Sequence, residues 1–555
     1  MNASTLRTGG EALVGQLIEE GVVDLFGIPG VQLDWAVEAL REAASRIRYF
    51  VPRHEQATSY MADGYARTTG REGVYMVVPG PGVLNALSGL ATAYACNSRL
   101  LCIAGQIPSS ALGKGFGMLH ELPDQSGILK SLTKWHGAAR RPEDVPALVH
   151  EAFVQLRSGR PRPVAIEIPP DVLQGKADVM MLPKAPDAPL APDHALIEQA
   201  AALLSQARFP VIQAGGGAAA ADAGAALRAL AERLQAPVVM TEGARGVLDD
   251  RHPLALTALG GRSVLPRGDV LLVVGSRFLD AMARPTCANP RARFIYLNAE
   301  PQDMSVPRPS GLTIHADARL GAEAMLAALP SRMRPSMSER VAKVKAWCAV
   351  QIAAIEPQAG FTRALRRAMH DDDVLVSELT QIGYYANVAF PVFAPRRLIT
   401  PGYQGTLGYG FSTALGAAAG NPGRRIVSIS GDGGFGWGLQ ELATLARYRF
   451  DLSVVVFVDG QFGNVRRIQR RTFGAEFATE LTNPDLVLLA RAFGIPGTRV
   501  ASPQALEVEL RDARERGGPA LVAVDVGDMP SPWALIHPFV VPQSPPPPDP
   551  LADEE

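Results

Sequence analysis

The chain has 555 residues and a formal net charge of −1, with 54 Lys and Arg residues against 55 Asp and Glu residues. It is too long for one hydrophobic core, so we expect about three domains. The balanced charge and the lack of a basic stripe interleaved with aromatic residues exclude a nucleic-acid-binding surface.

Export and membrane insertion are also disfavoured by the sequence. No apolar run reaches membrane-spanning length, and the first residues lack the apolar stretch of an export signal. The cysteines have no metal-ligand spacing and are typical of reduced residues. We therefore expect a cytoplasmic protein with no membrane partner.

Two linkers rich in Pro and small residues, Met181–Ala195 and Pro330–Ser338, divide the chain into thirds. The tail is rich in Pro, and we expect it to be disordered because it cannot bury a core. The predicted units are an N-terminal domain, a central domain, a C-terminal domain and the tail, over residues 1–180, 195–330, 340–535 and 536–555.

Each third alternates short apolar runs with segments of helical spacing. The first third has such runs at 23–30, 74–82 and 100–106, and a helix is predicted to begin near His54, with Glu55 in its first turn. The central third has runs at 210–217, 269–278 and 293–301. The last third has them at 373–379, 425–433, 452–460 and 520–526.

Many of these apolar runs end in glycine and are followed by a helix. This pattern predicts doubly wound α/β domains, in which helices cover both faces of a parallel sheet. In such sheets ligands bind beyond the carboxyl ends of the strands. The glycine-rich strand ends are therefore candidate sites, although no strand is followed by the GxGxxG pattern and distant acidic residue of dinucleotide-binding proteins.

The last third contains the most informative strand end. A strand over Ile426–Ser430, a glycine turn over Gly431–Gly434, a helix over Leu439–Tyr448 and a strand over Leu452–Val458 form one βαβ unit. Asp432 follows the first strand, and another Asp lies 27 positions later at the end of the second.

Backbone amides and a helix N-terminus at Asp432 suit a diphosphate. A carboxylate beside a diphosphate needs a divalent cation between them, and Asp459 can supply a second oxygen ligand for magnesium. The alternative is a pair of turn-forming Asp-Gly steps.

The spacing from Gly431-Asp432-Gly433 to the strand end at Asp459 resembles the thiamin-diphosphate motif. The chain resembles thiamin-diphosphate-dependent enzymes over roughly residues 5–535, and most closely their acetolactate-synthase-like branch. The resemblance implies a pyrimidine-binding, a central and a diphosphate-binding domain. It also implies that Asp432, Asp459 and the backbone carbonyl of Gln461 bind magnesium. The family normally has Asn at the position of Asp459.

The segment RHEQATSYMADGYAR resembles the family segment with the catalytic glutamate, which is Glu55 here. In the family this carboxyl shares a proton with the ring nitrogen of the cofactor's aminopyrimidine, so that the exocyclic amine becomes an imine, which then removes the thiazolium proton. The resemblance also places Gln106 near the substrate. His120 stands in the substrate loop where acetolactate synthases usually have Gln, and its role is either structural or proton relay.

The resemblance assigns the remaining cofactor contacts to glycine-rich loops. Leu407 matches the apolar side chain that bends the cofactor, with an ordinary core leucine as the alternative. The backbone of Gly405 matches the acceptor of the cofactor's amine, and Gln381 a diphosphate contact. The predicted cofactor-binding residues are Gly30, Pro81, Asn85, Gln381, Gly405, Leu407, Gly431, Gly433, Gly434, Gln461 and Phe462.

Substrate contacts come from two segments. VGSRFLDA resembles the central segment whose Arg anchors the acceptor carboxylate, which makes Arg277 the candidate, with a surface Arg as the alternative. Ile468 stands where acetolactate synthases have a Trp that governs acceptor size. ALGGRS and RFLDA lack the residues usual around FAD, which argues against that cofactor, although Ala214–Gly217 would suit a nucleotide.

The resemblance favours decarboxylation of a 2-keto acid with carboligation to a second carbonyl compound. The alternatives are a simple 2-keto acid decarboxylase of the benzoylformate-decarboxylase kind and a non-catalytic thiamin-diphosphate-binding protein. In the family, one site combines two subunits, which predicts a homodimer or a homotetramer built as a dimer of dimers. The sequence specifies neither the keto acid, nor the acceptor, nor a regulatory subunit.

Overall fold

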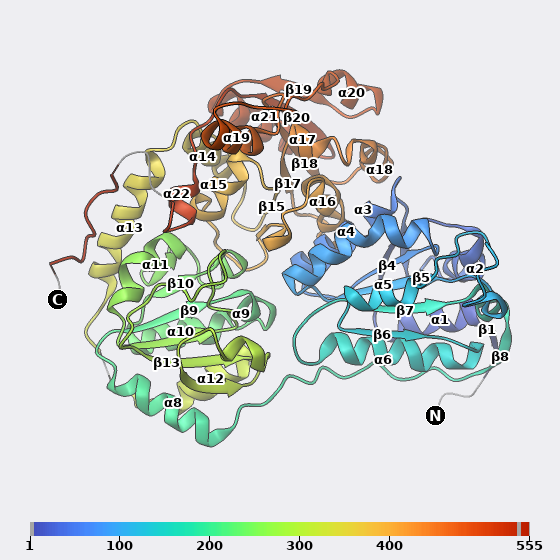
Figure 1. The fold of residues 1–555 in the computed structure, drawn as a ribbon, viewed down its shortest axis with the longest axis horizontal. Coiled ribbons are helices and arrows are strands. Elements are labelled where there is room, and N and C mark those ends of the chain that lie inside the picture. The colour runs from blue at the N-terminus through green and yellow to red at the C-terminus, as the bar shows by residue number, and fades with distance from the viewer. Residues whose placement is uncertain (1–4, 333, 541–544, 554–555) are drawn as a thin grey trace.

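The computed structural model describes residues 5–332, 334–540 and 545–553. Within these residues, three parallel sheets of six strands each form three α/β domains in chain order (Figure 1), which confirms the predicted fold class. A short antiparallel ribbon of β1 (Thr5–Thr8) and β8 (Lys176–Val179) ties the start of the N-terminal domain to its end. No helix in the described part of the chain is both long and apolar enough to cross a bilayer.

The N-terminal sheet has the strand order β3-β2-β4-β5-β7-β6. Its strands are β2 (Asp24–Gly27), β3 (Arg48–Phe50), β4 (Gly73–Val77), β5 (Leu100–Gly105), β6 (Trp135–Ala138) and β7 (Val164–Ile168). One face packs against α1 (Gly9–Glu19), α2 (Asp34–Glu42), α6 (Val145–Arg157) and α7 (Pro170–Gln174). The other packs against α3 (Glu55–Thr69), α4 (Pro81–Cys96) and α5 (Gln125–Ser131). Both faces are therefore buried, as continuous apolar strands require.

The C-terminal sheet, with the order β16-β15-β17-β18-β20-β19, repeats the topology of the N-terminal sheet. Its strands are β15 (Val374–Ser377), β16 (Leu398–Ile399), β17 (Ile426–Gly431), β18 (Leu452–Val458), β19 (Gly497–Val500) and β20 (Ala520–Asp525). Its helices are α14 (Gln358–Ala368), α15 (Gln381–Ala389), α16 (Tyr409–Gly420), α17 (Asp432–Phe435), α18 (Leu442–Tyr448), α19 (Gly463–Phe473), α20 (Leu486–Ala492), α21 (Pro503–Arg516) and α22 (Trp533–Ile536). A glycine turn was predicted over Gly431–Gly434, and the structure has the short helix α17 there.

The central sheet has a different order, β11-β10-β9-β12-β13-β14, which is that of dinucleotide-binding folds. Its strands are β9 (Pro210–Ala214), β10 (Val238–Met240), β11 (Ala255–Thr257), β12 (Val270–Val274), β13 (Arg293–Asn298) and β14 (Gly311–His315). The accompanying helices are α8 (His194–Gln206), α9 (Gly216–Ala220), α10 (Gly224–Leu234), α11 (Ala258–Val264), α12 (Ala318–Ala328) and α13 (Ser338–Ala353).

Helices α3 and α16 join the N-terminal and C-terminal domains (Figure 1). A Cβ on Gly64 would overlap the carbonyl oxygen of Thr413, and a Cβ on Gly416 would overlap that of Met61. The helices cross this closely because glycine stands at both contact points. The N-terminal domain is thereby fixed against the domain that carries Asp432.

The expectation of a disordered tail is wrong for residues 545–553. Leu551 is 1% exposed, and the carbonyl of Pro547 accepts a hydrogen bond of 2.8 Å from Trp347 Nε1. Asp549 accepts hydrogen bonds from Ser263 at 2.6 Å and Arg267 at 2.8 Å. The tail forms no core of its own, but it completes the surface of the central domain. Residues 541–544 and 554–555 of the predicted tail lie outside the described residues.

Candidate active site

Asp432 and Asp459 lie at the carboxyl ends of neighbouring parallel strands, since β17 pairs with β18 up to Gly431 and Phe457. Asp432 is buried, and its Oδ2 accepts hydrogen bonds from Gly460 N at 2.8 Å and Asn483 Nδ2 at 2.6 Å. Burial and the nearby Asp432 carboxylate raise the pKa of Asp459 to about 6. Two carboxylates that disfavour each other's charge suit a divalent cation between them.

The glycines around Asp432 leave room where a side chain would collide. A Cβ on Gly433 would lie 2.9 Å from the ring of Phe462, and one on Gly434 would overlap the carboxylate of Glu378. Gly431 is less restricted, because the nearest atom to its Cβ position is 3.7 Å away. Two of the three predicted glycines are therefore required by close packing at the strand end.

Gln461 and Phe462 lie two and three residues after Asp459. The amide of Gln461 donates to Asp459 Oδ1 at 3.1 Å, and its side-chain Oε1 is buried without a hydrogen-bond partner among the described residues. Gln381, the first residue of α15, accepts a hydrogen bond of 2.9 Å from Arg467. Of these two glutamine side chains, Gln381 thus has a partner for its oxygen, whereas the oxygen of Gln461 has none among the described residues.

Glu55 is the first residue of α3, as the sequence predicted. His54 caps the helix, with its Nδ1 accepting from Gln56 N at 3.1 Å. The Glu55 carboxyl is half-buried and accepts a hydrogen bond of 3.0 Å from Asn85 Nδ2 on α4. The structure therefore brings together one predicted catalytic residue and one predicted cofactor contact, from two different helices.

Gln106 follows β5, and its side chain is engaged inside the N-terminal domain. Its Nε2 donates to Glu167 Oε1 at 3.0 Å, and its Oε1 accepts from Ile107 N at 2.8 Å. Glu167 is buried and also receives hydrogen bonds from Gln125 Nε2 at 2.8 Å and His136 Nε2 at 2.6 Å. Gln106 is thereby held at one end of a polar network.

His120 lies in an exposed loop between β5 and α5. It adopts a left-handed backbone conformation (φ +70°), and its Nδ1 is buried without a hydrogen-bond partner in the described part of the chain. A Cβ on Gly80 would meet the backbone of His120, so this loop packs on the start of α4, where Pro81 is the first residue. Gly30 abuts Val78 at the neighbouring strand end. These residues share the carboxyl edge of the N-terminal sheet.

Leu407 projects outward rather than into the core, because its side chain is 39% exposed. Gly405 has the left-handed backbone that favours glycine (φ +59°). The Arg277 guanidinium of the central domain stacks over the ring of Tyr403, 4.9 Å from its centroid. Arg277, which is predicted to contact substrate, thus lies beside the loop that is predicted to hold the cofactor. The alternative that Leu407 is an ordinary core leucine is wrong.

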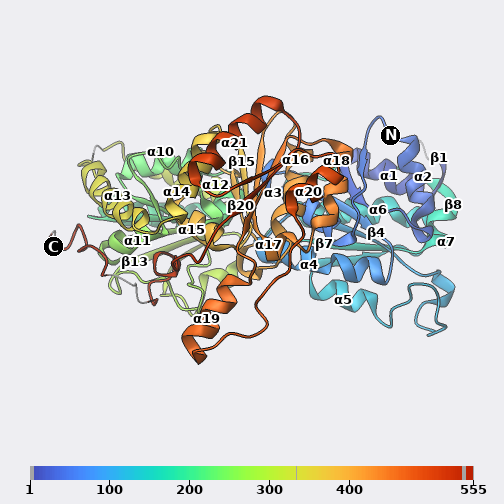
Figure 2. The ribbon, with the colours of Figure 1, turned by 90° about the horizontal axis from the view of Figure 1, so that it is seen from above.

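Ile468 lies on α19, which projects from the C-terminal domain (Figure 2), and its side chain is 50% exposed. On the same helix, Arg467 bonds both Gln381 and Asn464, at 2.9 and 2.6 Å. The helix therefore lies beside Gln381, and the side chain of Ile468 is not part of the core.

Two functional candidates were missed in the sequence, and both are buried carboxylates. Glu378 follows β15 and accepts hydrogen bonds from Gly408 N at 2.9 Å, Gly410 N at 3.0 Å and Ser430 Oγ at 3.0 Å. Burial raises the pKa of Glu378 to about 7. Its position at a strand end is the same signal that identified Asp432. Glu441 has no such signal, because the two amides that donate to it, those of Arg53 and His54, are far away in the sequence.

Gly215 and Gly217, within the run Ala214–Gly217, are explained by close packing. A Cβ on Gly215 would overlap the carbonyl of Gly275, and one on Gly217 would lie 2.8 Å from the Cα of Gly275. These glycines let the ends of β9 and β12 approach each other. The glycine run therefore gives no separate indication of a nucleotide.

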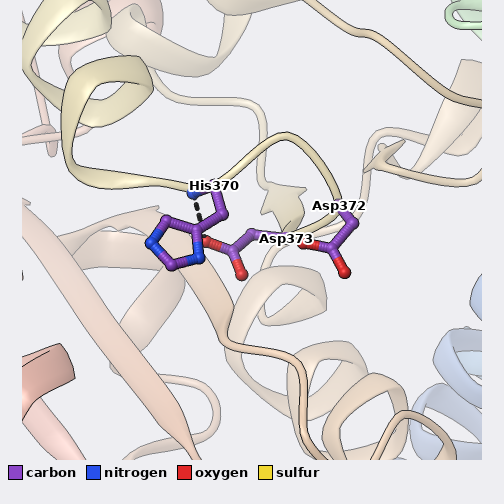
Figure 3. Close-up of side chains that lie close together, drawn as sticks. All are labelled: His370, Asp372 and Asp373. Atoms are coloured by element: carbon purple, nitrogen blue, oxygen red, sulfur yellow. Dashed lines mark hydrogen bonds between the residues drawn. The ribbon is translucent and has the colours of Figure 1, made fainter.

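His370, Asp372 and Asp373 lie close together in the loop before β15 (Figure 3). Asp373 accepts from the His370 amide at 2.7 Å and forms an ion pair with Arg514, while Asp372 lies 3.5 Å from Arg424. Because this loop is at the amino end of the strands, it lies at the opposite edge from Asp432. Its carboxylates are arranged for arginine pairing.

Family profiles match each of the three domains. Three profiles of the thiamine pyrophosphate enzymes match the chain, namely the N-terminal TPP binding domain at residues 7–128, the central domain at 197–329 and the C-terminal TPP binding domain at 379–524.

The chain is 36% identical to a probable 2-ketoarginine decarboxylase of Pseudomonas aeruginosa, with 91% of both chains covered. It is 32% identical to an acetolactate synthase of Arthrospira platensis and 30% identical to the acetolactate synthase isozyme 1 large subunit of Escherichia coli. Each of these two alignments covers 94% of both chains. The chain therefore belongs to the thiamine pyrophosphate enzyme family, in the branch that resembles acetolactate synthase large subunits.

Proposed function

We propose that the protein decarboxylates a 2-keto acid and joins the remaining fragment to a second carbonyl compound, as in acetolactate synthases. The observation that carries this proposal is the position of Arg277, which stacks 4.9 Å from the ring centroid of Tyr403, two residues before Gly405. A guanidinium at this place can anchor the carboxylate of an acceptor keto acid. Carboligation to a keto acid requires such an anchor, whereas release of an aldehyde does not.

The residues at the C-terminal site fit thiamin diphosphate and magnesium. Asp432, Asp459 and the backbone carbonyl of Gln461 would hold the metal ion, whose charge would offset the burial and the repulsion by Asp432 that raise the pKa of Asp459. The close-packed glycines after β17 and the N-terminus of α17 would hold the diphosphate, together with Gln381 and Phe462. When bound, the cofactor supplies the carbon nucleophile and the electron sink for decarboxylation.

The other residues would bind, orient and exchange protons. Glu55 would hold a proton at the ring nitrogen of the pyrimidine, with Asn85 fixing the orientation of its carboxyl. The backbone of Gly405 would accept from the pyrimidine amine, and the exposed Leu407 would support the bend of the cofactor.

The substrate side would combine Gln106, His120 and Ile468. The polar network around Glu167 holds Gln106 in one orientation. The buried Nδ1 of His120 has no hydrogen-bond partner among the described residues and could relay a proton to or from the substrate. We propose that Ile468, which is smaller than the usual Trp, widens the acceptor pocket.

We propose that the active unit is a homodimer with shared sites, assembled further into a homotetramer. In this arrangement Glu55 of one subunit would serve the diphosphate site of its partner. The supporting observation is the exposure of Leu407 and Ile468, which need a covering surface when they contact cofactor and substrate.

A simple decarboxylase is the second candidate. It is favoured by the 36% identity to the 2-ketoarginine decarboxylase and by the Ile at position 468.

We further propose a cytoplasmic location, where the unpaired cysteines Cys96, Cys102, Cys287 and Cys348 would stay reduced. We propose that FAD is not needed, because the segments ALGGRS and RFLDA lack the residues usual around it.

The test is a turnover assay with thiamin diphosphate and magnesium, with and without FAD, on pyruvate and on 2-ketoarginine. We expect acetolactate from pyruvate, and Glu55→Gln to lower kcat by about 100-fold or more, because a general acid–base residue contributes that much. An aldehyde as the sole product would favour the decarboxylase. Absence of cofactor binding, measured by calorimetry, would overturn both candidates.

A further inference from the structure

Glu441 lies at the start of α18, in the C-terminal domain, and its carboxylate is completely buried. It contacts the N-terminal domain of the same chain. Arg53 N donates to Glu441 Oε2 at 3.0 Å, and His54 N donates to Oε1 at 3.0 Å. Thr444 adds a hydroxyl hydrogen bond of 2.5 Å to Oε2. One side chain therefore satisfies two backbone amides that lie 388 and 387 positions away.

These two amides come directly before Glu55. His54 is the N-cap residue of α3, and Glu55 is the first helical residue. In the described part of the chain, neither amide has another hydrogen-bond partner. The Glu441 carboxyl therefore supplies the acceptors for both amides and fixes the main chain at the point from which Glu55 projects.

A second contact holds the same turn of α3. A Cβ added to Gly408, which follows Leu407, would lie 3.4 Å from Gln56 Nε2 and 2.8 Å from the Cβ of Trp437. The first turn of α3 thus packs on the loop predicted to support the cofactor. The rest of α3 is anchored separately by its glycine crossing with α16. Only the first turn depends on Glu441.

We infer that Glu441 is a positioning residue for Glu55, and that the C-terminal domain thereby controls how the N-terminal domain presents its proton-transfer group. This inference rests on the proposed role of Glu55. The hydrogen bonds to Glu441 do more than hold two domains together. Their donors are the amides of the two residues directly before Glu55, whose carboxyl must meet the cofactor. A small displacement of such a group reduces proton transfer strongly.

The test compares Glu441→Gln, Glu441→Asp and Glu55→Gln in the holoenzyme. Besides kcat, it measures cofactor affinity and the rate at which the thiazolium C2 proton of the bound cofactor exchanges with D2O. We expect Glu441→Gln to slow both exchange and kcat by about 10- to 100-fold. Cofactor affinity should stay within about threefold, because Asp432 and Asp459 are unchanged. Glu441→Asp should recover part of the exchange rate, since it restores two carboxyl oxygens as acceptors.

A matched control is Glu20→Gln. Glu20 is another buried carboxylate, bonded to Arg157 at 2.7 Å and to the amide of Ala185 at 3.0 Å, in the N-terminal domain. This variant should lower the melting temperature and leave the exchange rate unchanged. It separates a general loss of stability from a local displacement of Glu55.

Two results would overturn the inference. One is a folded Glu441→Gln enzyme whose exchange rate and kcat stay within about twofold of the wild type. The other is a parallel loss of exchange rate and cofactor affinity, which would show a collapsed site rather than a displaced carboxyl. If Glu55→Gln itself exchanged at the wild-type rate, the proposed role of Glu55 would fail instead.

Discussion

At the scale of single residues, the site depends on carboxylates that have two different surroundings. Asp432, Asp459 and Glu55 lie at strand or helix ends, and ligands of parallel sheets bind at the carboxyl ends of the strands. Glu378 and Glu441 are completely enclosed and accept hydrogen bonds from backbone amides. A buried acceptor must be satisfied internally, so these two hold loops in place rather than meet ligand.

Glu378 should make stability depend on pH. Burial raises its pKa to about 7 in the folded protein, above the ordinary value near 4.3 for the unfolded chain. The folded state therefore binds the proton more tightly, and the stabilisation, complete below pH ~4, is lost as the pH rises through about 7. This loss amounts to about 3 kcal/mol between pH 4 and 8.

Glu378→Gln cannot titrate and should lack this change. Urea unfolding at several pH values between 4 and 8 would measure it as the difference between the two curves. Curves that run parallel across this range would contradict the assignment.

The two predicted metal ligands should respond differently to replacement by Asn. Asp459→Asn restores the residue usual in the family, and an amide oxygen is still a ligand for magnesium, so activity should fall by less than about tenfold. Asp432→Asn should abolish magnesium-dependent cofactor binding. The reason is that its carboxylate also accepts from Gly460 and Asn483, where an amide nitrogen would face donors. Magnesium titrations followed by calorimetry would measure both, and equal losses would argue against separate roles.

At the scale of elements, strand ends and helix crossings position the site. The parallel pairing of β17 with β18 sets Asp432 beside the end of the strand that leads to Asp459. Glycines at the crossing of α3 and α16 set the distance between the two domains that carry the site. The C-terminal tail adds a further contact, since Leu551 is buried on the central domain.

Gly416→Ala should destabilise the crossing of α3 and α16. The added methyl group would collide with the carbonyl of Met61, and overpacking of this kind costs about 2 kcal/mol. Denaturant unfolding would measure the loss. Gly216→Ala is the control, because the nearest atom to its Cβ position is 3.7 Å away. Equal stability of the two variants would show that the helices separate without cost.

At the scale of the whole molecule, the N-terminal and C-terminal sheets share one strand order, and the central sheet has another. The two outer domains carry the complementary halves of the predicted site, with Glu55 on one and Asp432 on the other. The central domain contributes Arg277 beside the loop of the C-terminal domain. The proposed dimer would place the halves of two chains opposite each other.

Complementation should reveal shared sites. In a mixture of Glu55→Gln and Asp432→Asn chains, a mixed dimer would contain one site with both residues intact. Random pairing would therefore restore about a quarter of the wild-type activity, although each variant alone is inactive. The measurement is activity after the two chains are unfolded together and refolded, or coexpressed. No recovery in mixed dimers, isolated with two affinity tags, would place each site within a single chain.

The sequence by itself determined the class of fold and predicted the candidate site residues at the strand ends. The alternation of apolar runs, glycines and helical segments predicted three parallel sheets, and the segment around Asp432 predicted the βαβ unit of β17 and β18. Glu55 was placed correctly at the start of a helix. These features are local, because periodicity and turn chemistry depend on residues close in the sequence.

Only the tertiary structure decided which distant residues meet. In the structure, Gln106 donates to Glu167 and Arg277 stacks on Tyr403. Leu551 is buried on the central domain, where the sequence had predicted disorder. It also joined Glu441 to the amides before Glu55, across 387 residues and two domains. Such contacts follow from how whole domains pack, since a buried polar group takes whichever partner the packing brings within reach.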